Sequence, residues 1–349
     1  MITGDHPATA TAIGREIGLL SGGEGVITGS EVDDLTEADL RQRVSGISVY
    51  ARVTASHKLR VIRAWRATGA VVAMTGDGVN DAPAVAAADI GIAMGGSGAQ
   101  VTCQSADMIL TDDSFATIVE AVEEGRGIHD NIRNTLQFLV SGSVGELLFM
   151  TLCVVLGLPT PLLPIHLLWI NLVTDGLPGL CLAAGATDPD VMKGGPRLPV
   201  RGFADRALMG SMALTGTLTA AVAFGVYLVS LRSGTVETAR GSAFAVLVFS
   251  ELFRSFGARS STRPAWRMVP RFNFPLVAVV LVSVALQVLG QNHAAFGRIL
   301  HTPPMPFGEC LVLMGLGCIP FVALEVLKVL RRKPASGTVR SAAHGGDVA

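Results

Sequence analysis

The sequence predicts two kinds of structure in one chain, an α/β region followed by an all-α transmembrane bundle of six helices. Half of the 349 residues are hydrophobic and only 16% are charged, which favours a membrane protein over a soluble one. The pattern changes near residue 135, where short alternating apolar runs give way to long apolar segments. The net charge of −1 and the lack of a basic block in the first 110 residues predict no nucleic-acid partner.

The α/β region is predicted from short apolar runs that alternate with helix-like stretches. Strands are expected at 71–74, 90–94 and 108–110, and helices at 57–67 and 82–88. The segment 114–133 predicts a further helix, because Ser114 can cap it and apolar residues recur at helical spacing. We expect this helix to continue into the first apolar segment as a stalk, although Gly125 and Gly127 oppose it locally.

The transmembrane bundle is predicted from six apolar segments, at 136–158, 162–184, 207–231, 242–256, 274–289 and 307–330. The longest of them can cross a hydrocarbon core of about 30 Å, whereas the fourth and fifth are short. We therefore divide the chain into an α/β domain at 1–113, a stalk at 114–135, a six-span domain at 136–333 and a disordered tail at 334–349.

The orientation of the bundle follows from its lysines and arginines. These residues gather in the loop 192–206, in the loop 257–273 and after residue 327, whereas the alternate loops carry few of them. Because basic loops stay in the cytosol, the α/β domain, both basic loops and the tail are predicted to be cytosolic. We expect an integral protein of the plasma membrane.

One motif carries most of the chemical information. Residues 74–83 read Met-Thr-Gly-Asp-Gly-Val-Asn-Asp-Ala-Pro and follow a strand-like apolar run. The carboxylates of Asp77 and Asp81 are therefore expected at the carboxyl end of a strand, where ligands bind in open α/β sheets. Two carboxylates, an amide and two glycines can hold Mg²⁺ and let the backbone approach a phosphoryl group. A plain glycine-rich turn is the alternative.

This motif resembles the hinge motif of the P-type ATPases, the cation pumps that form a phosphoenzyme. Residues 1–5, Met-Ile-Thr-Gly-Asp, resemble an earlier motif of that family, and 51–58 resemble the segment that carries its phosphate-facing lysine. Residues 159–178 are similar to the calcium-pump branch. The resemblance implies part of a HAD-like phosphorylation domain mounted on a membrane bundle.

The resemblance also assigns roles to residues of the α/β domain. Asp77 is expected to bind Mg²⁺, and Asn80 and Asp81 to organise the phosphorylated aspartate and its attacking water. Lys58 would offset phosphoryl charge, although an ordinary exposed lysine on an amphipathic helix is the alternative reading. The residues expected to line the same cleft are Thr3, Gly4 and Asp5, with Arg52 as a weaker candidate.

Part of the family's machinery is absent from these residues. The family phosphorylates the aspartate of an Asp-Lys-Thr-Gly motif, and no aspartate in this chain is followed by lysine. The nucleotide-binding domain that holds ATP, the actuator domain and the first four spans would all precede Met1. We expect an ion-translocating ATP hydrolase in the complete pump and an inactive chain without that N-terminal half. A truncated gene, a misplaced start and a split subunit remain open.

Polar residues in the predicted spans indicate an ion path, because such residues are costly in lipid. Glu146 lies in the first span, Asn171, Thr174 and Asp175 in the second, and Glu251 in the fourth. Their oxygens suit a hard cation such as Ca²⁺. The alternative is that they only form hydrogen bonds between helices.

Two further features of the spans bear on the cation. Gly176 and Pro178 follow Asp175, where we expect the helix to break and free backbone carbonyls. The calcium pumps have asparagine where this chain has Ser143, and a hydroxyl is a weaker ligand than an amide. The position that would use Ser143, Glu146, Thr174 and Glu251 is thereby weakened. A pump for Mn²⁺, Na⁺ or H⁺ and a membrane-anchored HAD-like regulatory fragment without transport are the alternatives.

Overall fold

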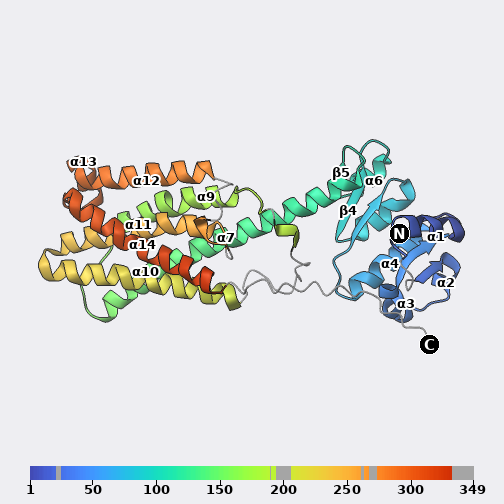
Figure 1. Cartoon of the computed structure of the whole chain (residues 1–349), viewed down its shortest axis with the longest axis horizontal. Helices are drawn as coiled ribbons and strands as arrows, with labels where there is room; N and C mark the ends of the chain where they lie inside the picture. The colour runs from blue at the N-terminus through green and yellow to red at the C-terminus, as the bar shows by residue number, and fades with distance from the viewer. Residues whose placement is uncertain (21–24, 189, 194–205, 261–262, 267–272, 332–349) are drawn as a thin grey trace, which may run out of the picture. The chain divides into compact units, whose positions relative to one another are not determined.

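The computed structural model describes residues 1–20, 25–188, 190–193, 206–260, 263–266 and 273–331. The chain divides into two compact units, an N-terminal unit of residues 1–122 and a C-terminal unit of residues 123–349 (Figure 1). The disordered tail expected at 334–349 and four of the expected cytosolic arginines, Arg197, Arg201, Arg267 and Arg271, lie outside the described residues.

The N-terminal unit contains two small parallel sheets. In one, β1 (Gly25–Thr28) pairs with β2 (Ile47–Ala51), and Ile2 forms a parallel bridge to Tyr50 of β2. In the other, the strand order is β3-β4-β5, with β3 at Ala73–Gly76, β4 at Ile90–Met94 and β5 at Met108–Leu110. The expected strands at 90–94 and 108–110 are confirmed.

The strand expected at 71–74 is displaced by two residues. Its true extent is set by pairing with β4, in which Ala73 faces Ile90 and Gly76 faces Ala93. Val71 lies before the strand with 61% of its surface exposed, so hydrophobicity alone misplaced the strand. As a result, the first three residues of the 74–83 motif are part of β3 itself.

Helix α4 (Ala55–Ala67) joins the two halves of this unit. Its Val61 packs into a core with Val32, Leu40 and Tyr50 beside the first sheet, while the next residue, Ile62, packs with Met74 beside the second. The other helices of the unit are short: α1 at Pro7–Glu16, α2 at Gly29–Asp33, α3 at Glu37–Arg43, α5 at Ala82–Ala87 and α6 at Gln100–Ser105.

Helix α7 (Phe115–Val155) begins in the N-terminal unit and continues without interruption into the C-terminal unit. Gly125 and Gly127 do not interrupt it. Gly127 is required by packing, because a Cβ there would collide with the side chain of Thr187. The first apolar segment is thus the second half of a helix of 41 residues.

The C-terminal unit is a bundle of long helices (Figure 1). Five described helices are long and apolar enough to cross a membrane: α7, the helical segment Pro164–Ala183, α10 (Arg206–Ser233), α12 (Phe274–Asn292) and α14 (Phe307–Arg331). Helix α11 (Val236–Ala258) coincides with the fourth predicted span but carries more charge. Its 23 residues extend over roughly 34 Å at the α-helical rise.

Helix α11 forms the core of this bundle. Residues 241–252 are all buried, and the helix packs against both α10 and α14. Small residues allow the close approach: a Cβ on Gly317 of α14 would lie 2.7 Å from the Cβ of Phe249. Helices α10 and α7 also approach closely, because a Cβ on Gly216 of α10 would lie 2.9 Å from the carbonyl oxygen of Ser141 in α7. Such contacts are typical of helices packed in membranes.

The predicted break after Asp175 is wrong. The segment continues as helix from α8 (Pro164–Trp169) through a π-helical stretch at Ile170–Gly176 into α9 (Leu177–Ala183). Pro178 has no N–H to donate, and it lies at the second position of α9, directly after the π-helical stretch. The helix therefore accommodates the Gly-Pro sequence by widening to a π turn, a feature that occurs often at functional sites.

Candidate functional site

The first half of the candidate site is the turn that follows β3. The 3-10 turn Val79–Asp81 follows this strand and leads directly into α5. Gly76 is required here, because a Cβ would lie 2.6 Å from the Cβ of Asp81. Helix α6 and its N-cap residue hold the other side of the turn. The amide of Ala99 donates to the carbonyl of Asp77 at 2.7 Å, and the hydroxyl of Thr102 donates to the carbonyl of Gly78 at 2.7 Å.

This turn separates the two aspartates of the motif. Asp81 is 7% exposed, and its Oδ1 accepts a hydrogen bond from the Nζ of Lys58 in α4. Asp77 and Asn80 are exposed. The structure thus joins Lys58 to the motif as an ion pair, and it leaves the carboxylate of Asp77 open. Carboxylate and amide oxygens are suitable Mg²⁺ ligands, so Asp77 and Asn80 fit that ion.

The Thr3-Gly4-Asp5 motif lies beside the segment that leads into α4. Thr3 donates its amide to the carbonyl of Tyr50 at 2.9 Å and accepts from the amide of Val53 at 3.2 Å. Within the motif, the hydroxyl of Thr3 donates to Asp5 Oδ2 at 2.9 Å. Arg52 donates its amide to the carbonyl of Asp5 at 3.0 Å, with a left-handed φ of 50° and an exposed side chain.

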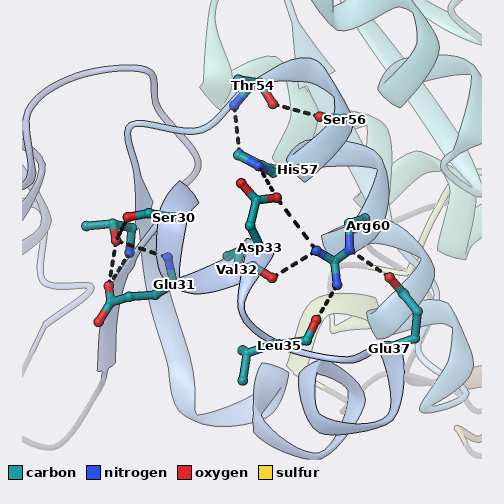
Figure 2. A network of polar contacts seen from close by, with 11 residues as sticks. Ser30, Glu31, Val32, Asp33, Leu35, Glu37, Thr54, Ser56, His57 and Arg60 are labelled. Atoms are coloured by element: carbon teal, nitrogen blue, oxygen red, sulfur yellow. Dashed lines mark hydrogen bonds and ion pairs between the residues drawn. The ribbon is translucent and has the colours of Figure 1, made fainter.

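The beginning of α4 is held by a polar network that sequence reasoning missed (Figure 2). The Nδ1 of His57 accepts from the amide of Thr54 at 3.1 Å, so the ring proton is on Nε2, which lies 2.9 Å from Asp33 Oδ1. Arg60 donates to the carbonyls of Val32 at 2.8 Å and Leu35 at 2.6 Å. The Thr-x-x-His spacing at the helix start was the available signal. The network holds the helix turn that carries Lys58.

The second half of the candidate site consists of three acids in the membrane helices. Glu146 is 8% exposed, Asp175 4% and Glu251 1%. Among the described residues, one carboxylate oxygen of each acid is buried without a hydrogen-bond partner: Glu146 Oε1, Asp175 Oδ1 and Glu251 Oε2. Glu251 packs against α7 at Gly142, one turn before Glu146. A Cβ on Gly142 would lie only 3.1 Å from the carboxylate of Glu251.

Arg254 is the charged residue that sequence reasoning missed. Its side chain is 2% exposed and is the largest fully buried side chain in the described structure. One guanidinium nitrogen donates to Glu251 Oε1 at 2.6 Å, and the other donates to the carbonyl of Phe138 at 2.8 Å and to the hydroxyl of Ser141 at 2.5 Å. Glu251 is therefore already partly neutralised by a cation of the chain.

The other expected cation ligands lie apart from these acids or are hydrogen-bonded to backbone. Ser143 is exposed, with its hydroxyl bonded to the carbonyl of Leu139 at 3.2 Å. Thr174 is buried and donates to the carbonyl of Ile170 at 2.8 Å. Asn171 is exposed and donates to the carbonyl of Leu167 at 2.9 Å. No group of three acidic, histidine or cysteine side chains in the described residues is close enough to hold a metal ion.

Comparison with known proteins agrees with this arrangement. Residues 159–330 match the family model described as cation transporting ATPase, C-terminus, and residues 1–89 match that of the haloacid dehalogenase-like hydrolases. A calcium-transporting ATPase of Bacillus subtilis is 38% identical over 335 residues, which cover 95% of this chain and 38% of that protein.

Relatives outside the bacteria match over a similar extent. Calcium-transporting ATPase 1 of Schizosaccharomyces pombe is 39% identical, over 98% of this chain and 39% of its own length. The human calcium-transporting ATPase type 2C member 2 is 37% identical, over 95% of this chain and 35% of its own length. The chain thus spans little more than a third of the relatives it matches. It belongs to the P-type cation-transporting ATPases, and it matches their C-terminal part.

Proposed function

We propose that this chain forms the ion-binding and hinge part of an ATP-driven pump that exports Ca²⁺ from the cytosol through an aspartyl-phosphate cycle. The observation that carries the proposal is the set of three buried carboxylate oxygens in membrane helices that have no partner among the described residues. Buried charges of this kind are costly, and they persist where a cation binds.

The charges around these acids favour one divalent cation. Glu146, Asp175 and Glu251 carry three negative charges when ionised, and Arg254, bonded to Glu251, offsets one of them. The remaining two charges match one Ca²⁺, which would draw the acids closer together than they lie in this structure. Oxygen ligands favour Ca²⁺ over Zn²⁺ or Cu⁺, and relatives named calcium-transporting ATPases agree with a calcium cargo. Because Asn171 is exposed, a helix supplied by the rest of the pump can complete the site from that side.

The N-terminal unit would receive the phosphoryl group. Bound at Asp77 and Asn80, Mg²⁺ would neutralise phosphoryl charge. Asp81 holds the ammonium group of Lys58 at the motif. Thr3, Gly4 and Asp5 lie next to the segment that leads into α4, the helix that carries Lys58. The outer side of β3 has no strand partner among the described residues, so a strand from the preceding half of the pump can pair there.

The proposal places the N-terminal unit in the cytosol and six spans in the plasma membrane, with α11 as the fourth. Reporters after Gly234 and after His293 should then lie outside the cytosol. A cytosolic reporter at Gly234 would contradict the six-span arrangement.

The test of the function joins this chain to the preceding part of the Bacillus subtilis relative. The chimera should form an acid-stable phosphoenzyme from ATP in the presence of Ca²⁺, and the chain alone should form none. Asp175→Asn should abolish Ca²⁺-dependent phosphorylation, whereas Ser143→Ala should leave it in place. Phosphorylation that responds to Mn²⁺ or Na⁺ but not to Ca²⁺ would replace the proposed cargo, and equal phosphorylation without any added cation would argue against transport.

A further inference from the structure

Helix α12 carries a polar stripe that the proposed site does not use. Ser283, Gln287 and Gln291 follow one another at intervals of four residues and therefore share one face of the helix. Each of the three is only 1% exposed. On the same face, nearer the start of the helix, the buried positions Leu276 and Val280 are apolar. One half of the buried face is thus apolar and the other half polar.

The polar atoms of this stripe have almost no protein partners. Among the described residues, Ser283 Oγ, Gln287 Oε1, Gln287 Nε2 and Gln291 Nε2 are buried without a hydrogen bond. Of the side-chain atoms of the stripe, Gln291 Oε1 has a partner in the described structure, the thiol of Cys310 in α14 at 3.5 Å. Buried amides are almost always hydrogen-bonded, so four unpartnered atoms along one face indicate a ligand that supplies both donors and acceptors.

That ligand is not lipid or another chain. The opposite face of α12 carries the exposed apolar residues, with Leu281 at 64%, Val282 at 57% and Leu289 at 59%. The polar stripe is covered by this chain itself, because α12 packs against α11, α9 and the π-helical stretch. A small molecule that both donates and accepts hydrogen bonds is required, and water has that chemistry.

The position of the stripe relative to the ion site follows from one hydrogen bond. The amide of Asn273 donates to the carbonyl of Cys181 at 3.0 Å, which places the start of α12 beside α9. Ser283 lies ten residues beyond Asn273, and Asn171 lies ten residues before Cys181. At the helical rise, both lie about 15 Å from that contact. The stripe therefore extends from the level of Asn171 to Gln291, whose carbonyl accepts from the amide of Met305 at 3.3 Å beyond α13 (Ala294–Leu300).

We propose that Ser283, Gln287 and Gln291 hold a file of ordered water molecules inside the bundle, from the α13 end of α12 to the level of Asn171. Such a file gives water and protons a path toward the buried acids. That role at the acids depends on the proposed function, whereas the presence of water does not.

The unmodified full chain in lipid nanodiscs provides the first test. Both Cys310 and Cys153 are buried in the apolar core of the bundle, but Cys310 contacts the stripe, whereas Cys153 lies two residues from the end of α7. The small hydrophilic reagent methanethiosulfonate ethylammonium should modify Cys310 roughly tenfold faster than Cys153, because only a hydrated thiol ionises readily. Equal rates for the two thiols would overturn the proposal.

Two substitutions test the interior of the file. With the native cysteines replaced by alanine, Gln287→Cys should react faster than Val280→Cys, which lies on the apolar half of the same face. Gln287→Met should lower the thermal midpoint, because it removes the partner of bound water, whereas Leu276→Met serves as a volume control. In a dry bundle, Gln287→Met would remove an unpaired amide and raise the midpoint. A raised midpoint, or a Gln287→Cys thiol as slow as that of Val280→Cys, would overturn the proposal.

Discussion

The two units treat their charged residues in opposite ways. In the N-terminal unit, several charged residues around the site pair with protein groups and keep some contact with solvent, as in the ion pair of Lys58 with Asp81 and that of Arg60 with Glu37. In the C-terminal unit, the ion pair of Arg254 with Glu251 is fully buried beside carboxylate oxygens that have no partner within the described part of the chain. Water can replace a lost partner in the first unit. In the second it cannot do so easily, so each charge there has a larger energetic effect.

This difference also separates structural from ion-binding acids. Glu251 has a protein cation at 2.6 Å, whereas the described structure gives Asp175 no hydrogen bond at its buried Oδ1. An acid with a fixed partner stabilises the fold and is harmful to remove. An acid without one is held at a cost and is expected to serve a ligand.

The largest effect is therefore expected for Glu251→Leu in the full chain. It leaves the guanidinium of Arg254 buried without its carboxylate, which should cost about 3–5 kcal/mol of stability. Asp175→Asn, the matched control, should leave stability unchanged or raise it, because the described residues offer its buried Oδ1 no hydrogen bond that could be lost. Thermal unfolding in detergent followed by circular dichroism measures both.

A double variant sharpens this result. Replacing both Glu251 and Arg254 by leucine should recover most of the lost stability, because no buried charge is then left uncompensated. If the double variant is as unstable as Glu251→Leu alone, the ion pair is not the cause. If Asp175→Asn is equally destabilising, the proposed division between structural and ion-binding acids is wrong.

A smaller effect is expected where helices of the C-terminal unit touch through glycine. Gly216→Ala would place a methyl group 2.9 Å from the carbonyl oxygen of Ser141 and should cost about 1–3 kcal/mol, because α7 and α10 must separate. Gly225→Ala, on the same helix, would bring the new Cβ within 4 Å of no described atom outside its own stretch of helix and should be neutral or slightly stabilising. The thermal midpoints of the two variants should therefore move in different directions, and equal shifts would contradict close packing at Gly216.

The general architecture could be predicted from the sequence, because hydrophobic length and the 74–83 motif are local properties. The placement of β3 could not, because it depends on pairing with β4. The π turn at Ile170–Gly176 could not be predicted either, because Gly and Pro indicate a helix break unless packing keeps the helix continuous. The role of Arg254 depends on Phe138 and Ser141, which are more than 100 residues away in sequence.

The candidate site was predictable to the same extent. The roles of the 74–83 motif and of Lys58 were predicted from the resemblance of these segments to a known family, and the ion pair of Lys58 with Asp81 follows from the fold. Glu146, Asp175 and Glu251 were found because acids are rare in apolar segments. Which of them has a protein partner depends on helix packing, and neither spacing nor composition contains that information.

In the N-terminal unit, Lys58→Met should have a modest effect. It removes the ion pair with Asp81, whose side chain is 11% exposed against 17% for Lys58, and should cost about 1 kcal/mol because water replaces part of the contact. Lys193→Met is the matched control: Lys193 pairs with Asp190 at 2.9 Å but is 79% exposed, so no measurable cost is expected. Hydrogen exchange of α4 amides measures the first effect, and a loss of several kcal/mol would contradict the comparison between the units.

The smallest effect is expected just before α7, where Asp112 and Asp113, near the surface, accept hydrogen bonds from neighbouring residues. The hydroxyl of Thr117 and the amide of Ser114 donate to Asp112 and lower its pKa. The amides of Gly96 and Ser97 donate to Asp113 and lower its pKa as well. The pKa values of both aspartates are lower in the folded chain than in the unfolded chain. The contacts therefore contribute their full stability at a pH above the unfolded-state pKa, and this stability is lost as the pH falls through the folded-state pKa.

The exchange protection of the Gly96 and Ser97 amides, corrected for the intrinsic rate, should therefore be constant near neutral pH and decrease below about pH 4, the ordinary range of an aspartate. Asp113→Asn should show at every pH the low protection that the unmodified chain shows at acidic pH, so its protection should not change with pH. Asparagine still tolerates the left-handed φ of 52° at this position. The Lys58–Asp81 contact and the buried Arg254–Glu251 pair lie elsewhere and should be unaffected by this variant. Protection at Gly96 that is independent of pH in the unmodified chain would show that the carboxylate of Asp113 does not hold this turn.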